Sequence, residues 1–172
     1  MIAFRDTVTI HAPPARVWSW LESLPEHIHE WHPDHISARW VCGGAFVSNA
    51  EMEVNERLHG KPHRLRMAVT EVEPGRWVRY RLSSGLRGGF EVEPVANGTK
   101  FTATIEIGLS IPIIGALIDG VLRLLIPGRL EAIRRHQAEE GVNLKTLLEA
   151  KPSPREPNPP LHRMHANNAR AG

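Results

Sequence analysis

Glu56 is the first of several polar side chains that stand where the sequence pattern calls for an apolar residue. Along 50–58 the alternate residues are Ala, Met, Val, Glu and Leu, and strand alternation places them on one buried face. Burying an unpaired carboxylate costs several kcal/mol, so Glu56 needs a cation, a metal or a proton beside it. A salt bridge with an arginine, or a one-residue bulge that turns Glu56 outward, would explain the pattern equally well.

His136 and Glu140 interrupt the apolar stripe of the last predicted helix in the same way. This stripe follows three- and four-residue steps, and its other members are Leu130, Ile133, Leu144 and Leu147. Side chains four residues apart on a helix lie on one face, about 5–6 Å apart at Cβ. A histidine nitrogen and a carboxylate oxygen at that spacing can bind one ion, and a His–Glu pair bordering the core is the alternative.

A third concentration of polar groups is the segment 26–35, which holds four histidines around Trp31 and Pro33. Histidines on a turn are usually solvated, so this segment indicates a site only in combination with Glu56 and the His136–Glu140 pair. One of its histidines, together with Glu56 and the His136–Glu140 pair, would make a site of two histidines and two glutamates. Nitrogen and oxygen ligands without sulfur suit Zn²⁺, and also Mn²⁺ or Fe²⁺.

The elements that must position these residues follow from periodicity and turn signals. A strand is expected at 4–11, then a helix opened by Pro13-Pro14 and a short helix or turn at 25–31. Further strands are expected at 36–42, 46–58, 63–73, 76–82, 89–95 and 99–109, and a helical region over 113–149 with a break at Pro127-Gly128. This order predicts an α+β fold in which a curved antiparallel sheet wraps around one long helix and leaves a cavity.

The basic character of the sequence lies in its last residues. The chain has 21 Lys and Arg against 19 Asp and Glu, and removing the four basic groups and one acidic group of 151–172 leaves 17 and 18 in 1–150. The segment 151–172 is rich in proline and poor in large apolar residues, so we expect a flexible tail after one domain over 1–150. The body is therefore nearly neutral, and nucleic-acid binding is not expected. The strand arginines predicted to form a solvated outer face are Arg64, Arg66, Arg79 and Arg81.

Targeting signals and cysteine usage give no sign of export. The first residues lack the apolar stretch of a signal peptide, and the single cysteine, Cys42, excludes an internal disulfide. The most apolar stretch, 111–127, is shorter than the roughly 20 residues that span a bilayer, and we expect it to cover the core. A cytoplasmic protein without a transmembrane segment is therefore expected.

The sequence as a whole resembles the START-like superfamily, which includes Bet v 1, polyketide cyclases and aromatase-type proteins. The supporting features are the opening segment 10–18, the run of strands, and the long last helix with its segment 139–145. They cover about residues 4–149. The resemblance implies the helix-grip fold.

A narrower resemblance rests on Trp31-His32-Pro33-Asp34-His35, on Glu56 ahead of His59-Gly60-Lys61, and on His136-x-x-x-Glu140. These motifs are similar to those of diacetylphloroglucinol hydrolases, zinc enzymes that cleave the carbon–carbon bond between an acyl group and a phenolic ring. The resemblance implies that His32, Glu56, His136 and Glu140 bind the metal and that His35 faces the substrate, with an exchange between His32 and His35 left open. The chain lacks that family's large N-terminal extension, so the resemblance supports the metal more than the phloroglucinol substrate.

The reaction that this resemblance implies is hydrolysis of an aryl ketone. A divalent ion lowers the pKa of a bound water toward about 7 and polarises a carbonyl group. Attack by that water, with protonation of the leaving ring carbon, gives a carboxylic acid and the shortened phenol, and His35 would carry the proton. Tyr80 would hydrogen-bond a phenolic oxygen, and Trp31 and Trp40 would stack on the ring, with core packing as the alternative for these three.

Two other functions stay open at this point. One is a START-like module that carries a small hydrophobic molecule and performs no chemistry. The other is a metal-free polyketide cyclase or aromatase that uses histidine or glutamate as acid and base. All three functions imply a small hydrophobic or aromatic partner, and the sequence leaves the oligomeric state open, a homodimer included.

Overall fold

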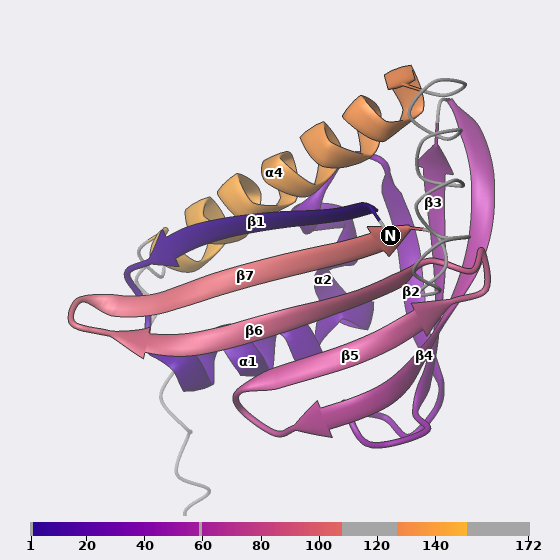
Figure 1. The fold of residues 1–172 in the computed structure, drawn as a ribbon. Helices are drawn as coiled ribbons and strands as arrows, with labels where there is room; N and C mark the ends of the chain where they lie inside the picture. The colour runs from indigo at the N-terminus through magenta and orange to yellow at the C-terminus, as the bar shows by residue number, and fades with distance from the viewer. Residues whose placement is uncertain (1, 59, 108–126, 151–172) are drawn as a thin grey trace, which may run out of the picture.

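The computed structural model describes residues 2–58, 60–107 and 127–150 (Figure 1). The predicted tail over 151–172 and most of the apolar stretch 111–127 lie outside these ranges, as does the first part of the predicted helical region, 113–126. Within the described residues, no helix is both long enough and apolar enough to cross a membrane.

The architecture is a curved antiparallel sheet of seven strands in the order β1-β7-β6-β5-β4-β3-β2, with helices against its concave face (Figure 1). The strands are β1 (Ile2–Ile10), β2 (His35–Cys42), β3 (Glu51–Leu58), β4 (Lys61–Glu73), β5 (Trp77–Leu82), β6 (Arg87–Val95) and β7 (Gly98–Ile107). The helices are α1 (Pro14–Glu22), α2 (Leu24–Trp31) and α4 (Pro127–Glu149). The predicted α+β helix-grip fold is confirmed.

Prolines set the boundaries of the two short helices. Pro14 occupies the first turn of α1, where a missing backbone N–H costs nothing. α2 ends at Trp31, and the next residue, His32, has φ −150° and ψ 141°, because a residue that precedes a proline is disfavoured in the helical region. The extended backbone at His32 starts the turn that leads into β2 and carries two of the candidate histidines.

The predicted strand 46–58 begins five residues too early. β3 starts at Glu51, and the preceding segment is a turn in which Asn49 has φ 64°, a left-handed conformation that ends extended structure. Phe46 in this turn is nevertheless buried and packs edge-on against Trp18 and Trp40. The apolar signal of Phe46 therefore reports core packing and not a strand.

The core lies between the concave face of the sheet and the helices. α1 buries Val17, Trp18 and Leu21, and α4 buries Leu144 and Leu148 against the same cluster. Leu147, which the stripe predicts to be buried, is only partly buried.

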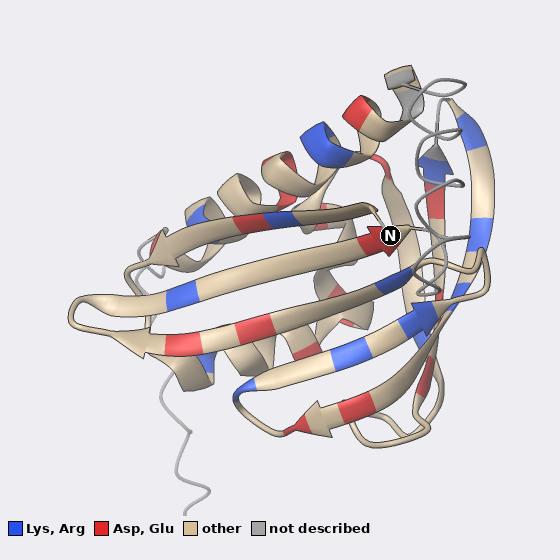
Figure 2. Ribbon diagram, in the orientation of Figure 1, with Lys and Arg blue, Asp and Glu red and all other residues tan. Residues whose placement is uncertain are grey.

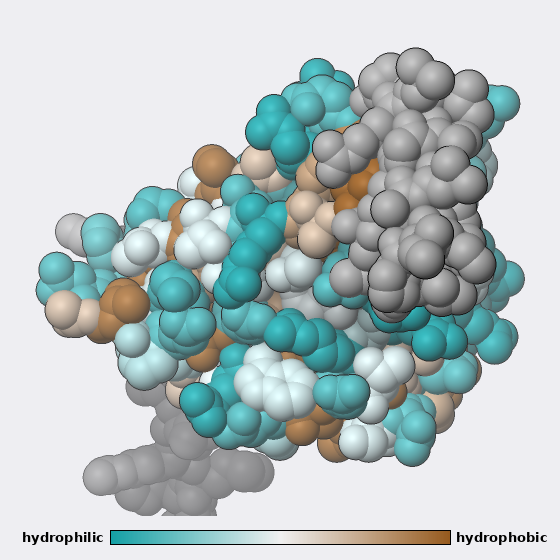
Figure 3. All heavy atoms as spheres, viewed as in Figure 1, coloured by the Kyte–Doolittle hydropathy of each residue, from teal (hydrophilic) through white to brown (hydrophobic). Residues whose placement is uncertain are grey.

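The convex face of the sheet is mainly hydrophilic (Figure 3) and carries basic bands along β4 and β5 (Figure 2). The arginines expected there, Arg64, Arg66, Arg79 and Arg81, lie on this face. Side chains on the convex face of β3 therefore lie near basic residues, whereas those on its concave face point toward the core.

Candidate functional site

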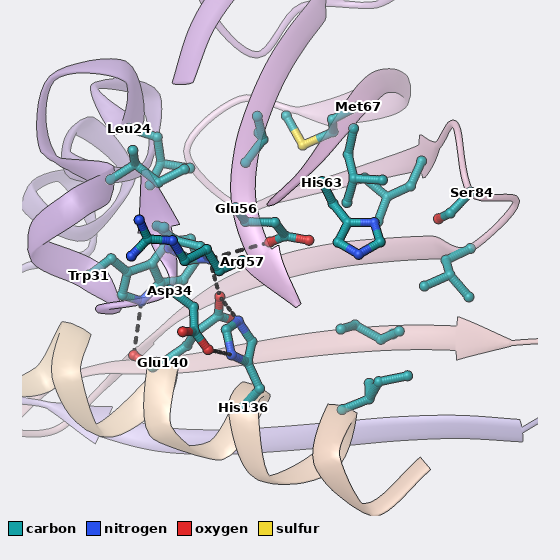
Figure 4. A pocket seen from close by; sticks show the side chains of 18 of the residues that line it. Leu24, Trp31, Asp34, Glu56, Arg57, His63, Met67, Ser84, His136 and Glu140 are labelled. Carbon is teal, nitrogen blue, oxygen red and sulfur yellow. Dashed lines mark hydrogen bonds and ion pairs between the residues drawn. The ribbon is translucent and has the colours of Figure 1, made fainter. Parts of the chain in front are cut away.

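A cavity of about 620 Å³ lies between the concave face of the sheet and helices α2 and α4 (Figure 4). Most of its lining is apolar, and it includes Leu24, Met52, Val54, Met67, Phe90 and Ile133. Four polar side chains gather on one wall: His35, Glu56, His136 and Glu140. We refer to these four as the inner cluster.

Strand register brings the first half of the inner cluster together. Glu56 on β3 pairs with His35 at the start of β2 and with His63 on β4, so an imidazole lies on each side of the carboxylate. His35 Nε2 is 3.8 Å from Glu56 Oε2. Neither alternative explanation of Glu56 applies, because the side chain faces the cavity and its neighbours are histidines instead of an arginine.

Helix α4 supplies the other half. Glu140 Oε1 lies 3.1 Å from His35 Nε2 and 3.3 Å from His136 Nε2, so both imidazoles direct the same nitrogen at one carboxylate oxygen. Two hydrogen bonds hold α4 against the end of α2: Trp31 Nε1 donates to the Glu140 carbonyl at 2.9 Å, and Asn143 Nδ2 donates to the Trp31 carbonyl at 2.8 Å. This reciprocal pair fixes the distance between the loop histidine and the helix.

The charges of the inner cluster are unevenly shared. Burial raises the pKa of Glu140, but hydrogen bonds and charge from His136 and His35 outweigh it and lower that pKa to about 2. Burial raises the pKa of Glu56 despite the nearby histidines. Burial lowers the pKa of His136, but Glu140, Glu56 and Asp34 outweigh it and leave that pKa raised. Glu140 is thus firmly ionised. Around Glu56, the positive charge of the histidines is too small to offset the cost of burying its carboxylate.

His32 lies beside the inner cluster but does not join it. The backbone N–H of Asp34 donates to His32 Nδ1 at 3.1 Å, and His32 Nε2 is 3.1 Å from Glu139 Oε2. Both ring nitrogens therefore have protein partners, and ligand atoms of His32, Asp34 and His136 form a second group within 4.8 Å of one another. The sequence resemblance implied His32 as a metal ligand, and the geometry favours His35 in that role.

Three donor-atom separations in the inner cluster lie near the spacing of a tetrahedral ion. Zinc bonds to histidine nitrogen and carboxylate oxygen are about 2.0–2.2 Å long, so the ligand atoms of a tetrahedral site lie about 3.3–3.6 Å apart. The separations of His35 Nε2 and His136 Nε2 from Glu140 are 3.1 and 3.3 Å, and that of His35 Nε2 from Glu56 is 3.8 Å. Ligand atoms of His35, Glu56 and His136 all lie within 4.8 Å of one another. Two nitrogens and two oxygens in this arrangement suit Zn²⁺, Mn²⁺ or Fe²⁺.

Two of the three aromatic residues expected to contact a ligand line the cavity. Trp31 and Tyr80 both pack against Phe90, with ring centroids 5.8 and 5.4 Å from it. Trp40 is not among the lining residues and packs against Phe46, in agreement with the core-packing alternative. Burial, with the charges of Glu140 and Glu56, raises the pKa of Tyr80, so its hydroxyl stays protonated and can donate a hydrogen bond.

The sequence patterns did not single out several residues around the site. His63 could have been found from the Gly60 turn, because a hairpin that pairs Leu58 with Lys61 must also pair Glu56 with His63. Asp34 and Glu139 carry no such signal, since their roles depend on how α2 and α4 approach each other. Gln137 is almost fully buried and donates to the Ala103 carbonyl at 2.6 Å.

Comparison with known proteins identifies the family. A family model described as "Polyketide cyclase / dehydrase and lipid transport" matches residues 1–140. The chain belongs to this family. No curated protein matches the chain.

Solved structures of this family's fold are similar over most of the chain. TTHA0849 from Thermus thermophilus has 21% identity and a TM-score of 0.64, with 86% of this chain and 97% of that chain covered. The di-domain ARO/CYC protein BexL from the BE-7585A biosynthetic pathway has 17% identity and a TM-score of 0.64, with 88% of this chain and 51% of that chain covered. Ara h 8.0201 has 17% identity and a TM-score of 0.52, with 83% and 97% covered. At these identities the likeness shows the fold alone.

Proposed function

We propose that this protein is a metal-dependent hydrolase that cleaves the carbon–carbon bond between an acyl group and the ring of a small phenolic or polyketide-like ketone. One observation carries the proposal: two imidazoles and two carboxylates gather on the wall of an apolar cavity, with nitrogen–oxygen separations of 3.1, 3.3 and 3.8 Å. The narrower sequence resemblance and the donor set support it.

The cavity supports an aromatic substrate of modest size. A volume of about 620 Å³ lies within the range of small-molecule sites, which are mostly apolar with a few placed polar groups. Trp31, Phe90 and Tyr80 form an aromatic wall beside the inner cluster, and aromatic pairs favour edge and offset contacts with a ring. Met52 and Met67 line the same cavity and adapt to ring faces and edges.

The proposed reaction consumes one water and divides the ketone into a carboxylic acid and a phenol. A bound divalent ion supplies Lewis acidity, which activates water at neutral pH and polarises the carbonyl group. His35, Glu56, His136 and Glu140 would hold that ion, so the role of proton carrier passes from His35 to another group. His63, which lines the cavity next to Glu56, is placed to deliver a proton to the leaving ring carbon. The protonated Tyr80 hydroxyl would donate to a phenolic oxygen and stabilise the departing ring.

A metal-free polyketide cyclase or aromatase is the second candidate, and the charge distribution favours it. Without a metal, Glu56 has a raised pKa and His136 has a raised pKa, so a carboxyl and an imidazolium group face one cavity. Pairs of titratable groups with shifted pKa values are typical of acid–base catalysis. The family description and the ARO/CYC neighbour agree with this reading.

The two candidates differ in their dependence on metal. Protein stripped of metal and then loaded with Zn²⁺, Mn²⁺ or Fe²⁺ is incubated with mono- and diacetylated phloroglucinol and resorcinol, and NMR follows acetate and the shortened phenol. We expect turnover only in a loaded form, its loss in Glu140→Gln, and its retention in the matched variant Glu53→Gln on the other face of β3. Equal turnover with a chelator present would contradict the hydrolase, and ligand binding without turnover would indicate a binding module.

A further inference from the structure

We infer that the ketone bound in this cavity carries an aliphatic acyl chain of several carbons, and that a separate part of the cavity takes that chain. Five aliphatic side chains line this part, which we call the aliphatic lobe: Leu65, Leu82, Leu86, Ile105 and Ile133. This inference rests on the proposed function, in which the bond between an acyl group and a ring is cleaved. It goes beyond that function by naming the acyl group and the side chains that select it.

The aliphatic lobe and the aromatic wall differ in how completely their side chains are packed. Trp31, Tyr80 and Phe90 of the aromatic wall are no more than 9% exposed. All five side chains of the aliphatic lobe are only partly buried, although each is apolar and lines the cavity. The lobe therefore keeps apolar surface that a ligand can cover.

The concave face of β6 places the lobe beyond the aromatic wall. Phe90 and Gly88 lie on this face, and Leu86 follows just before the strand. The Tyr80 ring lies over Gly88, because a Cβ added there would be 2.5 Å from Tyr80 Cε2. Leu86 is four residues from Phe90, about 13 Å along an extended chain. The Leu82 N–H donates to the Leu86 carbonyl at 2.8 Å, which brings both leucines to the β5–β6 hairpin.

Helix α4 follows the same order. Gln137 donates to the carbonyl of Ala103, and Ala103 pairs with Phe90, so this part of the helix lies level with the aromatic wall. α4 runs antiparallel to β7 (Figure 1). Ile133, one turn before Gln137, therefore lies toward Ile105, the β7 residue that is two positions beyond Ala103 on the same face.

The inner cluster lies between these two parts of the cavity. In Figure 4, Trp31 lies on one side of Glu56, and His63 and then Ser84 lie on the other. Leu65 follows His63 by two residues on β4 and shares its concave face. A carbonyl group held at the inner cluster therefore has the aromatic wall on one side and the aliphatic lobe on the other.

The two substituents of the ketone match these two surroundings. The phenolic ring packs on the aromatic wall, where the Tyr80 hydroxyl can donate to a phenolic oxygen. The acyl chain, on the other side of the carbonyl carbon, then extends into the aliphatic lobe. An acetyl group ends beside the inner cluster, whereas a chain of several carbons covers the partly buried leucine and isoleucine side chains. Removal of that apolar area from water favours the longer chain.

Binding of a chain-length series tests the lobe without any turnover. Metal-free wild-type protein is titrated with phloroglucinols that carry an acetyl, butanoyl, hexanoyl or octanoyl group, and calorimetry measures each dissociation constant. We expect the affinity to rise about fourfold for each added methylene group, as far as hexanoyl. Equal affinity across the series would overturn the inference.

Variants of the lobe separate this site from general hydrophobic binding. Ile133→Gln on α4 and Ile105→Thr on β7 should each lower the ratio of octanoyl to acetyl affinity by about tenfold, with acetyl affinity near the wild-type value. The matched control Val142→Gln, at an exposed position of α4, should keep the wild-type ratio. A wild-type ratio in both lobe variants would overturn the inference.

Methyl NMR locates the chain in wild-type protein, so the result does not depend on the folding of a variant. With isoleucine methyl groups labelled, the end of the octanoyl chain should show nuclear Overhauser contacts to Ile105 and Ile133. Ile28 of α2 lines the cavity on the same helix as Trp31 and should show none. Contacts to Ile28 in place of Ile105 and Ile133 would overturn the inference.

Cleavage by zinc-loaded protein distinguishes failure of this inference from failure of the proposed function. The value of kcat/KM should rise with chain length in wild type and lose that dependence in Ile133→Gln. If all four compounds are cleaved equally well, the proposed function stands and the inference is overturned. If no metal-loaded form cleaves any of them, the proposed function is overturned, and the binding series and the NMR contacts decide whether the lobe takes the chain.

Discussion

Glu53 and Glu56 lie three residues apart on β3, and both side chains are nearly buried, yet they have opposite surroundings. On the convex face, Glu53 accepts from Arg64 Nη2 at 2.6 Å and from Arg39 Nε at 3.0 Å. Hydrogen bonds from Arg64 and then Arg39 lower its pKa to about 2. On the concave face, Glu56 meets histidines and a second glutamate, and burial raises its pKa.

The difference shows what makes a buried carboxylate a candidate for chemistry. Arginine is always charged and its fork geometry matches a carboxylate, so Glu53 has all the partners that it can use. The partners of Glu56 can lose their charge, and Glu140 competes for the same imidazoles. A buried carboxylate in that state favours a cation or a proton, and this is the property that the following predictions test.

The largest expected difference between the two faces is in metal affinity. Glu56→Gln and Glu140→Gln should each weaken zinc binding by more than about 100-fold, because removing a ligand exceeds the 10- to 100-fold cost of disturbing its surroundings. Glu53→Gln should leave affinity and stoichiometry at the wild-type values. Elemental analysis after dialysis against a chelator measures both. Equal loss of metal in Glu53→Gln and Glu56→Gln would remove the distinction between the faces.

Two neighbouring glycines of β6 extend the comparison to the aromatic wall. A Cβ at Gly88 would lie 2.5 Å from Tyr80 Cε2 on the concave face, and one at Gly89 would lie 2.7 Å from the Val78 carbonyl on the convex face. Each alanine variant should cost about 1–3 kcal/mol of unfolding free energy by overpacking. Gly88→Ala should also weaken binding of an acetylated phenol, by about tenfold, since it displaces Tyr80.

Denaturant titration and ligand titration separate these two effects. Gly128→Ala is the matched control, because no atom of the described residues lies within 4 Å of its Cβ position. If Gly89→Ala weakens ligand binding and Gly88→Ala does not, the ligand binds on the convex face, which would contradict this account.

Glu56→Gln should stabilise the metal-free protein at neutral pH, by on the order of 1 kcal/mol. A carboxyl whose folded pKa is raised stabilises the fold when protonated, and that contribution is lost as pH rises from the unfolded value of 4.5 through the folded pKa. The neutral glutamine keeps this stabilising contribution as the pH rises. The gain in melting temperature over wild type should therefore be present at pH 7 and vanish below about pH 4.5. A destabilised Glu56→Gln at pH 7 would show that Glu56 is satisfied as an ion.

Glu53→Gln should have the opposite sign and the smaller effect, because the two arginines are largely exposed and solvent screens them. A carboxyl with a lowered pKa contributes stability above the unfolded value of 4.5 and loses it as pH falls toward the folded value of about 2. The variant should melt below wild type at pH 7 and converge with it near pH 2. The partly buried neighbour Glu51, 3.9 Å from Arg66, serves as the control in Glu51→Gln. Equal effects at both positions would argue against a special role for Glu53.

The sequence was sufficient to predict the order of elements and three of the four inner-cluster residues. Glu56, His136 and Glu140 are visible because periodicity assigns a face to each residue of a regular element, and a polar residue on an apolar face stands out. The choice between His32 and His35 was not predictable in this way. His32 lies in the turn after α2 and His35 is the first residue of β2, so periodicity assigns neither a face, and the deciding contacts are the Asp34 N–H and Glu139.

Long-range register accounts for the remaining differences. Alternation placed Glu53 on the solvent face correctly, but its burial depends on arginines from both neighbouring strands. Trp40 fell outside the cavity because Phe46 returns from the turn before β3 to pack against it. Neither contact is encoded by the pattern of a single segment.

Anomalous scattering at the zinc edge, from crystals grown with zinc, tests the central claim most directly. The account predicts one strong peak bound by His35 Nε2, His136 Nε2 and oxygens of Glu56 and Glu140, at about 2.0–2.2 Å. No peak at the inner cluster, or a peak bound by His32 in place of His35, would contradict it.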